Sequence, residues 1–325
     1  MDDKLLDIKN LSVAYNTYEG TVRAVRNASF SVGSAQNIGL VGESGAGKTT
    51  TALAVMRLVP DPPGKITNGG IYFQGRNLCD AAENEMESIR GNQISMIFQD
   101  PMTSLNPVLT IGIQIAEVVM THRGLSKSAA FKEAQALLEK VHIPAGRYKE
   151  YPHEFSGGMR QRVGIAMALA CNPSLIIADE PTSALDVTIQ AQIIDLMRDL
   201  QSEFDTSMIL ITHDLGIVAE ICDYVAVMYA GEIVETGSLE QIFTQPLHPY
   251  TIGLFKCVPR IVGNDKISPI GGGLYNPFSV PEGCSFHPRC LKKMPVCEQT
   301  APDGVSIDGH RVRCHLAAVR RRQEK

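Results

Sequence analysis

The stretch Gly42-Glu43-Ser44-Gly45-Ala46-Gly47-Lys48-Thr49 reads G-x-x-x-x-G-K-T and decides the fold of this chain. The apolar run 38–41 before it is typical of a buried strand, and residues 51–56 after it have the composition of a helix. This strand–loop–helix context predicts a phosphate-binding loop, because glycines let backbone N–H groups turn toward an anion. The start of the helix adds its unpaired N–H groups and positive dipole end. A glycine-rich turn with a solvated lysine is the alternative, which the four fixed positions and their flanks disfavour.

Two side chains of this loop have predicted roles in holding a nucleotide. Lys48 places a positive charge on the β- and γ-phosphates, and the hydroxyl of Thr49 is a ligand for Mg²⁺. Tyr15 is predicted to lie between the first two strands, where residues 5–32 alternate apolar and polar side chains. An aromatic ring at that place can stack on adenine, and a half-buried core tyrosine is the equal alternative.

The composition bounds the class of protein. The chain has 325 residues, 44% apolar and 20% charged, which are ordinary globular values. Its net charge of −5 disfavours nucleic acid as a partner, because nucleic-acid binders usually carry a basic face. The N-terminus lacks the layout of a signal peptide, and no stretch reaches the ~18 apolar residues of a membrane span, so we expect a cytosolic protein. Eight cysteines in a reducing compartment favour metal binding over disulfides.

Polar groups follow two predicted strands farther along the chain. Asp179 and Glu180 come directly after the apolar run 175–178, and His213 follows the run 208–211. Ligands of open α/β sheets bind at the carboxyl ends of such strands, so we expect these side chains at one edge of the sheet. The alternatives are that the two acids form a structural ion pair and that His213 is an ordinary hydrogen-bonded histidine. Before both of these strands, roughly residues 100–170 have a helical pattern, in which Ser156-Gly157-Gly158 opens a helix as a second anion site.

Residues 251–325 form a predicted C-terminal extension, rich in proline and glycine, after a domain of residues 1–250. Cys284, Cys290, Cys297 and Cys314 gather there with gaps of five, six and sixteen residues. A metal centre would cross-link a segment with so little core. The paired C-x₂₋₄-C spacing of zinc sites is absent, whereas iron–sulfur clusters also take four thiolates with more variable gaps. His287 or His315 could replace Cys314, the most distant ligand.

Together these motifs resemble the nucleotide-binding subunits of ATP-binding-cassette (ABC) transporters over about residues 5–260. The matches are the Walker A loop 42–49, the Q-loop Gln99, the signature 156–159, the Walker B strand 175–179, Glu180, the D-loop 183–186 and the switch His213. Met159 departs from the glutamine of the general signature. Five stretches have sequences that resemble those of the oligopeptide/dipeptide importer branch: residues 42–45, 100–107, 155–162, 248–251 and 283–290.

The resemblance implies a fold and a site. The fold is α/β, with a P-loop NTPase core, an antiparallel β subdomain, an inserted helical subdomain and the cysteine-containing extension. Glu180 and His213 are the implied catalytic residues, and Thr49, Gln99 and Asp179 the implied Mg²⁺ ligands. The implied nucleotide-binding set is Tyr15, Gly42, Ser44, Gly45, Ala46, Gly47, Lys48, Thr49, Thr50, Gln99, Ser156, Gly157, Gly158, Asp179 and Asp186. Some relatives in this branch carry a [4Fe–4S] cluster on such a tail, which favours that cluster over zinc.

The resemblance also implies an assembly and leaves alternatives open. The signature of one cassette completes the site of another, so we expect a second, non-identical ATPase subunit. Two transmembrane permease subunits and an extracytoplasmic substrate-binding protein would complete the importer, with this chain on the cytoplasmic face of the inner membrane. Nickel, glutathione or oligosaccharide is an alternative cargo to peptides. A soluble ABC ATPase without a transport role, and a P-loop module that binds nucleotide as a switch, are more distant alternatives.

Overall fold

The structure is a computed structural model that describes residues 4–183, 185–257, 270–273 and 275–323. Residues 1–3 and Ala184 of the D-loop, both part of the sequence argument above, lie outside the described residues. The chain forms two compact units and enters each more than once. We call residues 33–37 and 80–211 the helical unit. The phosphate-loop unit comprises residues 4–32 and 38–79 together with the described residues from 212 onward.

The phosphate-loop unit begins with an antiparallel sheet. Its strands lie in the order β2-β1-β4-β5, with bounds β1 (Lys4–Thr17), β2 (Gly20–Gly33), β4 (Gly64–Phe73) and β5 (Arg76–Asn77). β1 buries Leu6, Ile8, Leu11 and Val13, while exposed or half-exposed residues alternate with most of them. This period of two is the pattern of strands that bury one face, as the sequence predicted.

A second sheet of the phosphate-loop unit carries the phosphate loop. Its strands lie in the order β11-β12-β10-β9-β3. β3 (Asn37–Val41) is parallel to β9 (Tyr224–Tyr229), which is antiparallel to β10 (Glu232–Ser238). The pairs β10–β12 and β12–β11 are also antiparallel. The helices here are α1 (Lys48–Val55), α8 (Leu215–Ile221), α9 (Leu239–Thr244) and α10 (Pro249–Lys256). This sheet extends beyond β10. β12 (His310–Arg313) and β11 (Gly304–Ile307) continue it.

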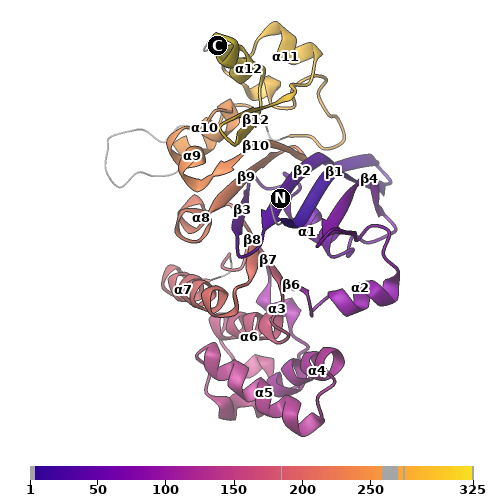
Figure 1. The fold of residues 1–325 in the computed structure, drawn as a ribbon, viewed down its shortest axis with the longest axis vertical. Helices are drawn as coiled ribbons and strands as arrows, with labels where there is room; N and C mark the ends of the chain where they lie inside the picture. The colour runs from indigo at the N-terminus through magenta and orange to yellow at the C-terminus, as the bar shows by residue number, and fades with distance from the viewer. Residues whose placement is uncertain (1–3, 184, 258–269, 274, 324–325) are drawn as a thin grey trace. The chain divides into compact units, whose positions relative to one another are not determined.

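The helical unit combines a parallel sheet with a group of helices (Figure 1). The strands of this parallel sheet are β6 (Ile94–Ile97), β7 (Leu175–Asp179) and β8 (Ser207–Thr212), and they lie in the order β8-β7-β6. Every residue of β7 and β8 is buried, as expected for parallel strands covered on both faces. The helices are α2 (Glu83–Ile89), α3 (Pro101–Ser104), α4 (Ile111–Arg123), α5 (Lys127–Lys140), α6 (Gly157–Leu169) and α7 (Val187–Phe204), with short 3₁₀ turns η1 (Ala145–Lys149) and η2 (Pro152–Glu154).

These elements confirm the predicted α/β class, with its antiparallel strands before the phosphate loop and its inserted helices. In α5 the buried residues Ala130, Ala134, Leu137 and Leu138 follow the helical spacing seen in the sequence. The domain boundaries, at residue 250 and near residues 100 and 170, stay predictions.

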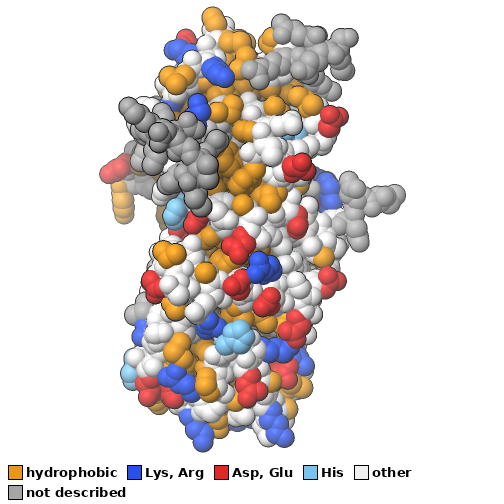
Figure 2. Space-filling view, turned by 90° about the vertical axis from the view of Figure 1, so that its left-hand side faces the viewer, with side chains coloured by type: hydrophobic (Ala, Val, Ile, Leu, Met, Phe, Trp, Pro, Cys, Tyr) orange, Lys and Arg blue, Asp and Glu red, His pale blue; other side chains and the backbone are white. Residues whose placement is uncertain are grey.

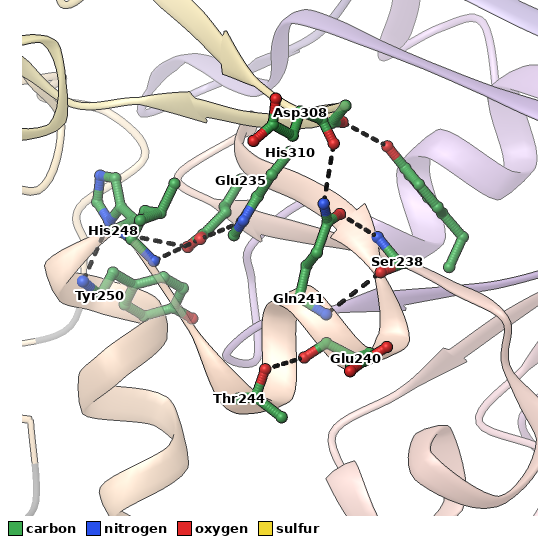
Figure 3. A network of polar contacts seen from close by, with 12 residues as sticks. Glu235, Ser238, Glu240, Gln241, Thr244, His248, Tyr250, Asp308 and His310 are labelled. Atoms are coloured by element: carbon green, nitrogen blue, oxygen red, sulfur yellow. Dashed lines mark hydrogen bonds and ion pairs between the residues drawn. The ribbon is translucent and has the colours of Figure 1, made fainter. Parts of the chain in front are cut away.

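A buried carboxylate joins the C-terminal extension to the second sheet of the phosphate-loop unit (Figure 3). Glu235 of β10 is 1% exposed and accepts hydrogen bonds at 2.6 and 3.0 Å from the backbone N–H groups of Leu247 and His248. His310 of β12 places its Nε2 2.7 Å from the same carboxylate. Burying a carboxylate without such partners costs folding free energy. The hydrogen bond from His310 therefore favours the position of β12 beside β10. The extension also contains η3 (His287–Arg289), α11 (Pro295–Gln299) and α12 (His315–Gln323).

The surface drawn in Figure 2 shows acidic and basic side chains interspersed among polar ones on the described part of that face. Among the described helices, none has the length and apolar content needed to cross a bilayer.

His248 predicts acid sensitivity of the fold. Its ring is buried, Nδ1 accepts the N–H of Tyr250 at the start of α10, and burial lowers its pKa from 6.5 to about 4, against the opposing effect of Glu235. Between pH 6.5 and 4 the unfolded chain therefore binds a proton that the folded chain does not. Stability falls as the pH drops through this window, by about 3 kcal/mol from this group.

The variant His248→Asn isolates this group, because the asparagine oxygen can still accept the N–H of Tyr250 without titrating. Urea unfolding midpoints across pH 4–7 should fall less steeply for this variant than for the wild type. His153→Asn, at an exposed histidine, is the matched control and should follow the wild type. Equal slopes for His248→Asn and the wild type would contradict the assignment.

Candidate nucleotide site

The phosphate loop connects β3 to α1 in the phosphate-loop unit. β3 is buried along its whole length, and Gly47, with φ 103°, begins α1 as its N-cap residue. A Cβ on Gly47 would also lie 2.4 Å from the carbonyl oxygen of Ala24. At Gly42 a Cβ would lie 2.1 Å from the carbonyl oxygen of Met228. Only glycine fits these two positions, so the loop can follow a tight path around an anion.

Lys48 lies inside this loop. Its side chain is 6% exposed, and Nζ donates to the carbonyl oxygens of Gly42 at 2.8 Å and Glu43 at 3.0 Å. A buried ammonium group needs such partners. They hold a positive charge beside the N-terminus of α1, where a phosphate would bind. Ser44, Gly45 and Thr49 are exposed, Thr50 is half-exposed and Ala46 is buried.

Two further predicted residues belong to the same unit. Tyr15 lies within β1, so its predicted place between strands is wrong. It pairs with Gly64 of β4 and is half-buried, and a Cβ on Gly64 would lie 2.6 Å from the tyrosine ring. His213 is exposed directly after β8, and the next residue, Asp214, begins α8 by accepting the N–H of Gly216 at 2.8 Å.

The predicted catalytic acid lies at the end of β7 in the helical unit. Asp179 is 2% exposed, and Glu180 follows in a left-handed conformation with φ 44°. The backbone N–H of Glu180 donates to the carbonyl of Ile211 at 2.8 Å. Gln99 donates from Nε2 to the Glu180 carboxylate at 2.9 Å. The sequence predicted separate roles for Gln99 and Glu180, and their direct contact had no sequence signal.

The signature residues begin α6 in the same unit. Ser156 is the N-cap, and its hydroxyl accepts the N–H of Met159 at 3.4 Å. Gly158 allows α7 to approach, because a Cβ there would lie 2.5 Å from Cγ2 of Ile189. Asp186 is the N-cap of α7 and accepts the N–H groups of Thr188 and Ile189, each at 3.1 Å. The helix therefore starts with its N–H groups oriented by serine, as the sequence predicted.

The four extension cysteines were tested as metal ligands. Cys297 and Cys314 are buried, and Cys284 and Cys290 are half-buried. Burial raises the pKa of the Cys284 thiol to about 11, against a backbone hydrogen bond at Phe286 that lowers it. The backbone N–H of Cys284 donates to the carbonyl of Cys297 at 2.8 Å. Within the described residues, however, no three His, Cys, Asp or Glu side chains form a group that could hold a metal ion. The described part of the chain therefore shows no metal centre at these four cysteines.

The predicted Mg²⁺ ligands were tested by their donor chemistry. Thr49, Gln99 and Asp179 offer a hydroxyl, an amide oxygen and a carboxylate, the oxygen ligands that Mg²⁺ prefers. Asp179 is buried at the end of β7. By donor chemistry alone, these three residue types suit this ion.

Comparisons with known proteins agree with this geometry. A family model described as ABC transporter matches residues 25–183, and one described as the C-terminal region of oligopeptide/dipeptide transporters matches residues 234–297. The chain is 50% identical over 318 residues to the dipeptide transport ATP-binding protein DppD of Bacillus subtilis, covering 97% of this chain and 95% of that protein. It is 50% identical over 303 residues to the oligopeptide transport ATP-binding protein OppD of Escherichia coli K12, covering 92% and 89%.

A solved structure extends the comparison to the fold. The dimeric ATP-binding cassette MJ0796 in a post-hydrolysis state, bound to ADP and Pi, matches with a TM-score of 0.65 and 28% identity. The match covers 72% of this chain and 98% of that one. The phosphate loop, the acids after β7 and the relatives of nearly equal length lead to one conclusion. This chain belongs to the ATP-binding, ATP-hydrolysing proteins of ABC transporters, within the oligopeptide/dipeptide transporter family.

Proposed function

We propose that this chain supplies the ATP hydrolysis that drives import of dipeptides and oligopeptides. The observation that carries this proposal is the 50% identity to a dipeptide transport ATP-binding protein over 97% of the chain. The match of residues 234–297 to the C-terminal region of such transporters supports it. Membrane and binding-protein subunits select the cargo, so nickel, glutathione or an oligosaccharide remains the alternative to peptides.

The proposed chemistry is in-line attack of water on the γ-phosphate, driven by positioning and electrostatics. Lys48 and the loop amides hold the phosphates, Tyr15 stacks on adenine, and His213 contacts the γ-phosphate. Glu180 polarises the attacking water, and its contact with Gln99 gives that carboxylate a fixed orientation. Thr49, Gln99 and Asp179 would hold Mg²⁺, which would supply charge neutralisation for the phosphates.

The proposed site is shared between two cassettes. Ser156, Gly157 and Gly158 at the start of α6 serve the nucleotide of the opposite subunit, as the family resemblance implies, and Asp186 belongs to the same nucleotide-binding set. The chain carries one phosphate loop and one signature, so two cassettes must face each other. ATP binding closes the pair and hydrolysis reopens it, a two-state equilibrium that the ligand biases. Residues 100–119 dock a permease subunit on the cytoplasmic face of the inner membrane.

Replacing the proposed catalytic acid tests the mechanism. Glu180→Gln should retain ATP binding and lose about 10²–10⁴-fold in turnover, because the amide cannot polarise water as a carboxylate does. Nucleotide affinity and phosphate release should be measured in the assembled transporter. Glu240→Gln, at an exposed glutamate in α9, is the control. Turnover of Glu180→Gln at the wild-type rate would show that Glu180 is not the catalytic acid.

The proposed assembly contains a second, non-identical cassette, two permease subunits and an extracytoplasmic binding protein. Co-expression with the neighbouring transport subunits and native mass measurement should find one copy of this chain per complex. ATP hydrolysis should require the assembled complex or a nucleotide-bound dimer. A transport-competent complex that contains this cassette twice and no other would refute the proposed pairing.

For the extension we propose a [4Fe–4S] cluster on Cys284, Cys290, Cys297 and Cys314, with zinc as the alternative. The burial of Cys297 and Cys314 supports it, as does the backbone hydrogen bond of 2.8 Å that joins Cys284 to Cys297. Protein purified without oxygen should be brown, with absorption near ~400 nm and about four iron atoms per chain. A colourless anaerobic preparation with one zinc and no iron would exclude the cluster. Its role would be structural or redox-sensing.

A further inference from the structure

Glu43 connects the phosphate loop to the C-terminal extension. Its carboxylate forms a two-pronged ion pair with Arg289, at 2.6 Å from one guanidinium nitrogen and 3.0 Å from the other. The two residues are 246 positions apart in the sequence and belong to the same compact unit. A planar guanidinium matches a carboxylate in both distance and direction, so this pair fixes the orientation of the glutamate.

Arg289 is itself held in place. Its side chain is 6% exposed, and Nε donates to the carbonyl of Gly271 at 3.0 Å. The guanidinium carbon lies 5.8 Å from the ring centroid of Tyr229 in β9. The hydrogen bond to Glu43 raises the pKa of Arg289 above its ordinary value, so the group stays charged. An arginine that is buried and fixed on several sides can transmit the position of the extension to the loop.

Tyr250 of α10 holds the backbone of the same glutamate. The N–H of Glu43 donates to the Tyr250 hydroxyl at 2.9 Å, and the ring is completely buried. Its centroid lies 4.7 Å from that of Tyr229 and 5.5 Å from that of Phe286 in the extension. Since the Glu43 carbonyl accepts from Lys48, the N–H, the carbonyl and the carboxylate of Glu43 all have partners.

A second set of contacts links the extension to the turn between β9 and β10, which is hydrogen-bonded to the phosphate loop. Gly231, between β9 and β10, donates to the carbonyl of Ala46 at 2.9 Å. The next residue, Glu232, pairs with Arg26 of β2 and Arg313 of β12, each at 3.2 Å. The extension thus supports the phosphate loop from two directions.

We propose that Arg289 and Tyr250 are positioning residues for nucleotide binding, and that the C-terminal extension is part of the phosphate site through Arg289. Arg289 neutralises and orients a carboxylate that would otherwise repel the phosphates, and Tyr250 fixes the backbone at the same point. This inference rests on the assignment of residues 42–49 as the phosphate loop.

Removing Arg289 and then its partner tests the proposal. Arg289→Gln leaves the Glu43 carboxylate unpaired in the loop and should weaken binding of Mg–ADP and a non-hydrolysable ATP analogue about tenfold. The double variant Glu43→Gln/Arg289→Gln removes the unpaired charge and should recover affinity to within about threefold of the wild type. Titration calorimetry of the full chain measures both dissociation constants. Lys293→Gln breaks an exposed ion pair with Glu298 in the same extension and is the matched control.

A purely structural role for Arg289 predicts a different pattern. Affinity of Arg289→Gln within about twofold of the wild type would overturn the inference. A double variant as weak as Arg289→Gln would also overturn it, because removal of Glu43 cannot repair a misfolded extension. If Arg289→Gln does not fold, Tyr250→Phe keeps the ring and should still weaken binding severalfold, and unchanged affinity would count against the proposal.

Nucleotide affinity of the variant Lys48→Ala distinguishes a failure of this inference from a failure of the phosphate-loop assignment. Normal nucleotide affinity in Lys48→Ala would show that residues 42–49 are not the phosphate loop, and both proposals would fail. Loss of binding in Lys48→Ala, with normal binding in Arg289→Gln and Tyr250→Phe, would remove only the positioning roles of Arg289 and Tyr250.

Discussion

The close approach of backbone atoms around the phosphate loop is the constraint on which the rest of this structure depends. Gly42 lies against the carbonyl of Met228 and Gly47 against that of Ala24, and neither contact leaves space for a Cβ. The loop therefore takes its path from β2 and from the end of β9, as well as from its own sequence. Lys48 then fills the loop from inside by donating to two of its carbonyl oxygens. A site built this way has its donors in place before any phosphate arrives, which lowers the cost of ordering them.

The sequence was sufficient where local patterns carry the structure. The G-x-x-x-x-G-K-T stretch, the buried runs of β7 and β8 and the spacing of Ala134, Leu137 and Leu138 in α5 each predict one element from neighbouring residues. The N-cap serine of α6 could also be predicted from the sequence, because a serine hydroxyl can accept an unpaired backbone N–H in the first turn of a helix. Prediction of the fold class followed from such local patterns, and the comparisons with relatives agree with it.

The sequence was insufficient where contacts join distant positions. Neither the pairing of Glu43 with Arg289 nor that of Gln99 with Glu180 produces periodicity, so only the folded chain shows them. β11 and β12 have four residues each and little apolar content, which hides them from pattern analysis. They join the sheet because Glu235 is buried and His310 satisfies it. Arg289 and Tyr250 lie in stretches typical of the oligopeptide/dipeptide branch. Apart from this resemblance, nothing in the sequence indicated their contacts.

Hydrogen exchange at the phosphate loop tests most directly whether the rest of the chain holds this loop ready for nucleotide. The N–H of Glu43 is bonded to Tyr250, and the N–H of Ala46 to the carbonyl of Glu43. Residue-resolved exchange of the full chain without nucleotide should therefore find both amides protected well above an unstructured loop. Exchange of these amides at the rate of an open loop, slowed only when Mg–ATP is added, would contradict the account.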